Sequence, residues 1–281
     1  MNKWCDEYVT VNGIKLHYYR TGGNKPQLIL NHGAMDDGLC WTRVTQELEK
    51  DYDVIMFDSR GHGLSDSGQG DYRSTTRATD IIQAIETLDL NKPVVGGHSM
   101  GADSSMYVAS IRPDLIRGFF MEDPPITMPG EPIFGGAMGE KFENPTKMMS
   151  MIASFFKHLP SFLTKPLAQK MMPDAPDEEI IPWVNSKKRV NKDFIQFMKN
   201  PSDDITEEPF SALKKIKAPG LLFIGDRENG SIVSETTAQE IKKILLNLTV
   251  THLIGANHDI RRAQFDGYIK ALKNFLADIY K

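Results

Sequence analysis

Ser99 is the residue whose surroundings most suggest a nucleophile. It is the centre of the pentapeptide Gly97–Gly101, of sequence Gly-His-Ser-Met-Gly, which follows the apolar pair Val94-Val95 and precedes small residues suited to the start of a helix. The pattern predicts a sharp strand-to-helix turn that exposes the serine Oγ, with glycines on both sides because a Cβ there would collide across the turn. The turn also directs the backbone N–H of Met100 towards the place where an oxyanion would form. We therefore predict nucleophilic attack by Ser99 on a carbonyl carbon.

A serine nucleophile needs a general base, and the chain has seven histidines. His258 lies in a late loop, after an apolar run that ends at Ile254 and before a predicted helix, at the sheet edge where Ser99 should emerge. The others fall in predicted strands, in glycine-containing loops or in a helical stretch: His17, His32, His62, His98, His158 and His252. We predict that His258 is the base and that His98 packs beside the turn or orients it.

Alternating strands and helices are expected to position these two residues. Continuous apolar runs predict strands, and apolar residues spaced three or four apart predict helices. The expected strands are 8–11, 14–19, 27–30, 54–57, 93–97, 116–121, 221–224 and 248–254, and the first two form a hairpin around Asn12-Gly13. The expected helices are 36–49, 75–88, 100–111, 234–246 and 261 onward. The alternation predicts an α/β fold with a mostly parallel, eight-stranded sheet covered by helices on both faces.

Residues 124–209 interrupt this alternation. They contain no buried strand pattern, but several helical stretches punctuated by proline: 145–159, 165–172, 177–189 and 193–199. We predict a core formed by 1–123 and 210–281, and a helical cap, or lid, over Ser99 formed by 124–209. The eight methionines and eight aromatic residues of this segment suit a pocket for bulky apolar ligands, although packing of the cap against itself explains them equally well.

Four motifs, in this order along the chain, resemble those of the α/β-hydrolase superfamily, in its esterase, haloperoxidase-like and C–C hydrolase branch. They are His32-Gly33, the segment Asp58–Ser65, the nucleophile turn Gly97–Gly101 and the histidine loop Gly255–His258. The resemblance covers about 26–123 and 218–281. It implies an α/β-hydrolase fold with the cap inserted after the sixth strand. It also implies a role for each of four residues: Ser99 as nucleophile, His258 as general base, and the backbone N–H groups of Ala34 and Met100 as the oxyanion hole.

The resemblance leaves open which carboxylate orients His258. In most of the superfamily the acid follows the seventh strand, where this chain has Asp226 and Glu228 in a pattern weakened by an extra Asn-Gly. Asp123 follows the sixth strand and precedes two prolines that fix the direction of the chain. Because some members of the superfamily resemble this second arrangement, we predict Asp123 as the acid, with Asp226 and Glu228 as alternatives.

Two further pairs of charged residues lie close to the predicted site in sequence. Asp36 and Asp37 are expected to cap the helix that follows them, although contact with a substrate is an alternative. Arg261 and Arg262 are expected to be solvated cations in the first turn of a helix, although they are also suited to binding a carboxylate.

The predicted function is that of a serine hydrolase of the carboxylesterase or lactonase type, which cleaves an ester or lactone through an acyl-enzyme on Ser99. The closest enzymatic alternative is hydrolysis of a C–C bond in a diketone, because that activity shares every motif above. A ligand-binding sensor that uses the same pocket without turnover is the non-enzymatic alternative. Dehalogenases and epoxide hydrolases of this fold resemble it with an aspartate in place of Ser99, so both are disfavoured. No motif implies a metal or nucleotide cofactor.

The amino-acid composition restricts the kinds of binding partner and the cellular compartment that we expect for this protein. The 281 residues carry 33 Lys and Arg against 37 Asp and Glu, a formal charge of -4 that argues against a nucleic-acid partner. No apolar run approaches the roughly 20 residues that span a bilayer, and the polar start of the chain does not resemble a signal peptide. Two cysteines suggest a reducing compartment. We expect a cytoplasmic monomer or small homo-oligomer that acts on a small, bulky and apolar ester or lactone.

Overall fold

The computed structural model describes residues 4–136, 145–172, 175–199 and 208–281. It contains an eight-stranded sheet in the order β1-β2-β4-β3-β5-β6-β7-β8. The strands are β1 (Cys5–Val11), β2 (Ile14–Arg20), β3 (Gln27–Asn31), β4 (Asp53–Phe57), β5 (Val94–His98), β6 (Gly118–Glu122), β7 (Gly220–Ile224) and β8 (Leu248–His252). β2 pairs antiparallel with both β1 and β4, and every other pair is parallel. The prediction of a mostly parallel, eight-stranded sheet is confirmed.

The first two strands form the predicted hairpin. Asn12 and Gly13 connect them, with φ angles of 47° and 74°. Both angles are positive, as a type I′ turn requires, and Asn-Gly is the pair of residues that adopts this turn most readily. Local sequence therefore accounts for this part of the fold.

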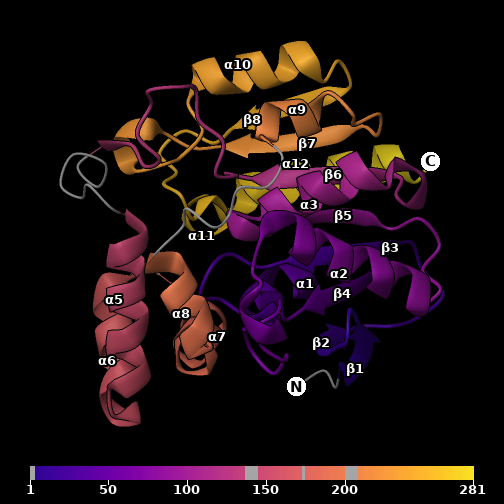
Figure 1. Ribbon diagram of the computed structural model, residues 1–281. Coiled ribbons are helices and arrows are strands. Elements are labelled where there is room, and N and C mark those ends of the chain that lie inside the picture. The colour runs from indigo at the N-terminus through magenta and orange to yellow at the C-terminus, as the bar shows by residue number, and fades with distance from the viewer. Residues whose placement is uncertain (1–3, 137–144, 173–174, 200–207) are drawn as a thin grey trace.

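Helices cover both faces of the sheet, and the alternation of side chains along the strands explains why. In β4, Ile55 and Phe57 belong to one buried cluster and Val54 and Met56 to the other. The first face is covered by α2 (Ser74–Thr87), α3 (Met100–Ile111), α9 (Pro209–Leu213) and α10 (Glu235–Ile244), and the second by α1 (Thr42–Leu48) and α12 (Phe265–Ile279) (Figure 1). The prediction of helices on both faces is confirmed.

The predicted helix 36–49 begins later than expected. Its first turn is a 3₁₀ helix, η1 (Gly38–Trp41), and α1 follows it directly. Asp37 caps this turn, because its side chain accepts a hydrogen bond from Leu39 N at 3.2 Å. Asp36 lies outside the helix and, contrary to expectation, is not a cap.

Within the described ranges, four helices lie between β6 and α9: α5 (Pro145–His158), α6 (Ser161–Met171), α7 (Asp177–Arg189) and α8 (Lys192–Lys199). We call them the inserted helices. α5 packs against α7 and α8, α6 packs against α7, and α7 also contacts η1 and α1 of the core. Figure 1 shows them gathered on one side of the molecule, apart from the helices that cover the sheet. Part of the predicted cap, including Met138, lies outside the described residues.

None of the helices in the described ranges is both long enough and apolar enough to cross a membrane.

Candidate active site

The chain makes a strained turn at Ser99, between β5 and α3. Ser99 has φ 50° and ψ −116°, which L-residues rarely adopt, and its side chain begins at the carboxyl end of β5. A Cβ on Gly97 or Gly101 would lie 2.4 Å or 2.1 Å, respectively, from the backbone oxygen of Asn31 on the neighbouring strand. The two glycines are therefore required for α3 to start directly after the strand.

His258 and Asp123 are joined by a short hydrogen bond. Asp123 Oδ2 lies 2.7 Å from His258 Nδ1, and the carboxylate is fully buried at the end of β6. Asp123 itself has a positive φ of 46°, a strained conformation of the kind that concentrates at functional sites. With Nδ1–H donated to Asp123, Nε2 of His258 carries the lone pair that can accept a proton.

The environment of His258 favours its protonated form. Burial lowers the pKa of the imidazole, but the hydrogen bond and the negative charge of Asp123 raise it by more, so the pKa lies above its ordinary value of 6.5. His98 assists in holding the loop, since its Nε2 lies 3.0 Å from the backbone oxygen of His258. Burial lowers the pKa of His98 well below the usual range, so this ring is neutral and Nε2–H is the donor.

The loop after β7 supplies hydrogen-bond donors to Asp123. Ser231 Oγ and Val233 N donate to Oδ1 at 2.8 Å and 2.9 Å, and Ile232 N donates to Oδ2 at 2.8 Å. Together with His258, these groups provide the carboxylate with four donors. Such a set of hydrogen bonds fixes the orientation of the carboxylate.

The two alternative acids are placed elsewhere. Asp226 accepts hydrogen bonds from His252 Nε2 and Gly255 N, each at 2.7 Å. Glu228 lies in η5, a 3₁₀ turn over Arg227–Asn229. Within the described ranges, neither carboxylate contacts His258.

The loop after β3 forms a tight turn beside Ser99. Asp36 N donates to Gly33 O at 3.1 Å, and Met35, the third residue of the turn, has a positive φ of 66°. Met35 N donates to His62 Nε2 at 3.3 Å. In the described part of the chain, Ala34 N donates to no protein acceptor, and Met100 N belongs to the first turn of α3, where N–H groups lack intrahelical partners. Both N–H groups are therefore available to a ligand.

Asp36, Arg261 and Arg262, which lie in separate motifs of the sequence, form one buried cluster with Lys187 next to this turn. Asp36 Oδ1 lies 2.6 Å from Lys187 Nζ, and Asp36 Oδ2 lies 3.0 Å from Arg262 and 3.6 Å from Arg261. Burial raises the pKa of Asp36, but these three cations lower it by more, to well below its usual range.

The expectation that Arg261 and Arg262 are solvated is wrong. The Arg261 side chain has no exposed surface and pairs with Glu122 at 3.2 Å, while Arg262 contacts Glu179 of α7 at 3.2 Å. Their acidic partners come from strands and helices distant in sequence, so the local pattern of a helix start did not reveal the burial. Such paired and hydrogen-bonded charges are the form in which arginine is tolerated inside proteins.

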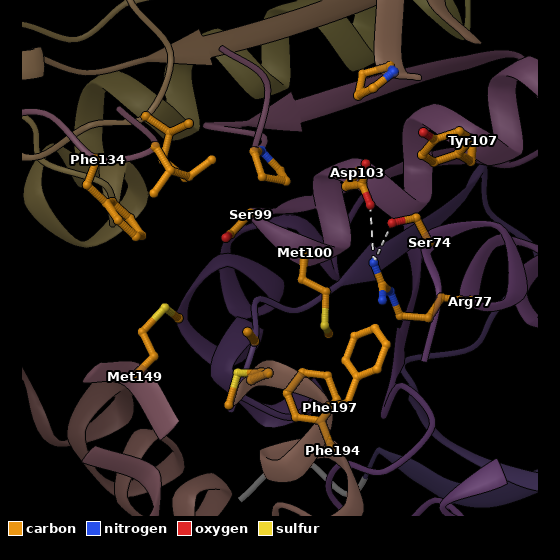
Figure 2. A pocket seen from close by; sticks show the side chains of 16 residues that line it. Ser74, Arg77, Ser99, Met100, Asp103, Tyr107, Phe134, Met149, Phe194 and Phe197 are labelled. Atoms are coloured by element: carbon orange, nitrogen blue, oxygen red, sulfur yellow. Dashed lines mark hydrogen bonds and ion pairs between the residues drawn. The ribbon is translucent and has the colours of Figure 1, made fainter. Parts of the chain in front are cut away.

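Ser99 lies where two cavities meet. The first, which we call the apolar arm, has a volume of about 310 Å³ and is lined mainly by Met100, Ile133, Phe194, Phe197, Met198 and Ile232. Figure 2 shows Ser99 on one side of this arm and Arg77 on the other, paired with Ser74 and Asp103. The second, which we call the charged arm because it carries the charged groups Asp36, Lys187, Asp259 and Arg262 together with His258, measures about 270 Å³. The rest of its lining is mainly apolar and includes Met148, Met149, Ile152, Met171 and Trp183. Ala34, Phe134 and Met149 line both arms.

Sequence reasoning missed three residues that hold this site together. They are Ser231, which donates to Asp123, His62, which accepts from Met35 N, and Lys187, which reaches from α7 to Asp36. Each acts on a partner at least 27 residues away, so the local sequence does not reveal this role, even for His62, which lies in the motif Asp58–Ser65.

Comparison with known proteins agrees with the fold. A family model described as alpha/beta hydrolase fold matches residues 26–171. N-formylmaleamate deformylase of Pseudomonas putida is 26% identical over 95% of each chain. 2-(Acetamidomethylene)succinate hydrolase of Mesorhizobium japonicum is 23% identical, over 92% of this chain and 90% of the relative. The crystal structure of an N-formylmaleamic acid deformylase from a Pseudomonas putida strain superposes with a TM-score of 0.79 at 22% identity, over 95% of this chain and 100% of that one.

The matched segment covers more than half of the chain and includes the nucleophile turn and the residues after β3 and β6. The remaining strands belong to the same sheet, and the fold of nearly the whole chain is similar to that of the solved structure. The chain therefore belongs to the alpha/beta hydrolase fold family and is a hydrolase.

Proposed function

We propose that the protein hydrolyses a carboxylic acid derivative through an acyl-enzyme on Ser99. The observation that carries this proposal is the 2.7 Å contact between Asp123 and His258 at the carboxyl edge of the sheet where Ser99 emerges. Ser99 Oγ attacks the acyl carbon while His258 Nε2 takes its proton, and the N–H groups of Ala34 and Met100 bind the oxygen that becomes negative. His258 then returns the proton to the leaving group as its bond to the acyl carbon breaks. Water repeats the cycle and releases the acid.

For the bond that is cleaved, the comparisons favour an amide or C–C bond over the ester or lactone that sequence analysis placed first. Both full-length relatives are named for substrates in which a formyl or acetyl group is attached to nitrogen. We therefore propose an N-acyl compound as the substrate, with hydrolysis of a C–C bond as the alternative.

The two arms suggest how such a substrate would lie. His258 lines the charged arm and is absent from the lining of the apolar arm, whereas Met100 lines only the apolar arm. Because His258 must deliver a proton to the departing nitrogen, the amine part belongs in the charged arm. The acyl part then extends into the apolar arm, whose volume of about 310 Å³ suits an acyl group larger than formyl.

The inserted helices would act as a cap over the bound substrate. Met149 of α5, Lys187 of α7 and Phe194 of α8 line the two arms, so the substrate would be held between these helices and the core. Excluding water in this way strengthens the electrostatic interactions with the oxyanion.

The proposal is tested by labelling and by a substrate panel. A fluorophosphonate probe should modify Ser99, detected by peptide mass, and the Ser99→Ala variant should remain unlabelled and lose turnover by on the order of a million-fold. The panel has three classes of substrate. The first consists of the N-formyl, N-acetyl and N-hexanoyl derivatives of one amino dicarboxylic acid. The second consists of the p-nitrophenyl esters of formic, acetic and hexanoic acid, and the third is a diketone.

We expect the largest kcat/KM for the N-acyl compounds. Turnover of the diketone alone would support hydrolysis of a C–C bond. Turnover of the esters alone would support the carboxylesterase or lactonase activity predicted from the sequence. A wild-type protein that neither reacts with the probe nor turns over any substrate would contradict the enzymatic proposal and favour a ligand sensor.

A further inference from the structure

Lys187 is a buried cation on the inserted helices that reaches the turn after β3. Its side chain is 2% exposed, and its Nζ lies 2.6 Å from Asp36 Oδ1, 3.1 Å from Met35 O and 3.3 Å from Ser186 Oγ. An ammonium has three N–H donors, and these three acceptors use all of them. The Trp183 ring lies 4.5 Å from the same nitrogen. A cation with this set of partners is an anchor and has no donor left for a substrate.

The residue it anchors is strained. Met35 has φ 66° at the third position of the turn Gly33–Asp36, where glycine is the usual residue because a side chain disfavours this conformation. Both polar groups of Met35 are held from outside the turn, the N–H by His62 Nε2 and the carbonyl by Lys187 Nζ. A strained conformation of this kind persists only where its surroundings hold it.

The same turn orients one donor of the proposed oxyanion hole. Gly33 O and Ala34 N belong to one planar peptide, so fixing the oxygen also fixes the direction of the N–H. Gly33 O accepts from His32 Nδ1 at 2.8 Å and from Asp36 N at 3.1 Å, and Asp36 is in turn held by Lys187. A continuous set of contacts therefore runs from α7, through Met35 and Asp36, to the N–H of Ala34.

From this geometry we infer that Lys187 is a positioning residue: it holds the Gly33–Asp36 turn in its strained form and so aims the Ala34 N–H at the oxyanion. Because Lys187 belongs to α7, the oxyanion hole is complete only while the inserted helices are seated on the core. This inference rests on the proposed acyl-enzyme mechanism and adds a residue that does not itself touch the substrate.

The first test is Lys187→Met, which removes the ammonium and keeps an apolar side chain of similar length. Asp36 retains Arg262 at 3.0 Å, so the variant does not leave this carboxylate unpaired. Removing one oxyanion donor costs about 100- to 1,000-fold in kcat, and a misdirected donor should cost part of that, about 10- to 100-fold, with little change in KM. The inhibition constant of a reversible alkyl boronic acid, which mimics the oxyanion, should rise by a similar factor.

Arg189→Met is the matched control. Arg189 lies on the same helix and contacts Asp37, the neighbour of Asp36, at 3.5 Å, but it does not contact Met35. Both variants remove one cation between α7 and the core. The control should keep kcat and the inhibition constant within about twofold of wild type, because Arg189 contacts neither Met35 nor Asp36 and its buried partner Asp37 keeps its hydrogen bond from Leu39 N. An equal loss in both variants would show that general seating of α7, and not the anchoring of Met35, is responsible, and would overturn the inference.

A double-mutant cycle separates positioning from simple support of the fold. Met35→Gly places at the strained position the residue that adopts it without cost, so the turn should no longer need Lys187. In this background the effect of Lys187→Met on kcat should shrink to about threefold or less. An undiminished effect of Lys187→Met in the Met35→Gly background would contradict the inference.

If Lys187→Met does not fold, Lys187→Arg provides the same test with the charge preserved. A planar guanidinium cannot place its donors where the ammonium places them, so we expect kcat to fall at least about fivefold while folding is retained. If the fluorophosphonate probe still labels Ser99 in a Lys187 variant, the variant is folded and its active site can be measured. A kcat and a boronic-acid affinity equal to those of wild type in that variant would overturn the inference. Failure of the wild-type protein to label would instead contradict the proposed function.

Discussion

The loops after β6 and β7 carry the three acids considered for orienting His258, and they use them differently. After β6, Asp123 is fully buried and accepts hydrogen bonds from His258 Nδ1 and from three groups of the other loop. After β7, Asp226 accepts from His252 Nε2 and Gly255 N and thereby ties the end of its own strand to β8. One loop carries the acid that contacts the histidine, and the other supplies the donors that hold this acid.

The comparison of the two loops shows that a buried carboxylate and the groups that donate hydrogen bonds to it can follow neighbouring strands. β6 and β7 are adjacent and parallel, so both loops leave the sheet at the same edge. A carboxylate at the end of either strand has similar access to His258. Here the carboxylate that contacts His258 is Asp123, and the same carboxylate accepts hydrogen bonds from Ser231, Ile232 and Val233.

The largest effect is expected for Asp123→Asn, which tests the β6 side of the comparison. The amide keeps the shape of the side chain but presents a donor in place of an acceptor to Nδ1, which leaves the imidazole in the wrong tautomer. We expect kcat to fall about ten-thousand-fold, as in serine proteases, with an unchanged circular-dichroism spectrum. A folded variant that keeps more than a few per cent of the wild-type rate would move the catalytic acid away from Asp123.

Ser231→Ala tests whether the β7 loop supports the acid. The variant removes one of four donors to Asp123, and the backbone N–H groups of Ile232 and Val233 remain. A hydrogen bond to a charged group contributes about 1.5–3 kcal/mol, so we expect kcat to fall about tenfold and the free energy of unfolding to fall in parallel. Loss of stability with unchanged kcat would mean that Ser231 supports the fold without tuning the acid.

The pH dependence of kcat/KM tests whether Asp123, and not an acid of the β7 loop, acts on His258. Catalysis requires neutral His258, so activity should rise with pH through the pKa of this residue, which Asp123 raises above 6.5 despite burial. In Asp123→Asn the raising effect of Asp123 on the pKa of His258 is lost, while the lowering effect of burial and the smaller raising effects of Asp259 and Glu122 remain, so the acid limb should move to lower pH. An acid limb that stays at the same pH in the variant would show that another group sets it.

The smallest effect is expected for Asp226→Asn and Glu228→Gln. Neither carboxylate contacts His258 within the described ranges, so kcat should stay within about twofold of wild type, as for substitutions away from the site. Asp226→Asn should lower the melting temperature by a few degrees, because it weakens the contacts to His252 and Gly255. Inactivation by either change would reverse the roles assigned to the two loops.

Sequence patterns alone predict much of the core, because they act over short distances. The Asn12-Gly13 hairpin and the Gly97–Gly101 turn have conformations that only certain residues adopt, so the residues identify the turn. Strands are recognised by continuous apolar runs, since parallel strands are buried on both faces. Ser99 and His258 are singled out for the same reason, because each lies in a loop whose local pattern is distinctive.

Tertiary structure decided what depends on which segments become neighbours. The contact between Asp123 and His258 joins residues 135 positions apart, and the contact between Lys187 and Asp36 joins residues 151 apart. A charged residue has the same local sequence pattern whether it is solvated or buried against a distant partner, which is why the burial of Arg261 and Arg262 and the anchoring role inferred for Lys187 were not foreseen. Strand order and the packing of α7 create these pairs, and neither is encoded within a single window of the chain.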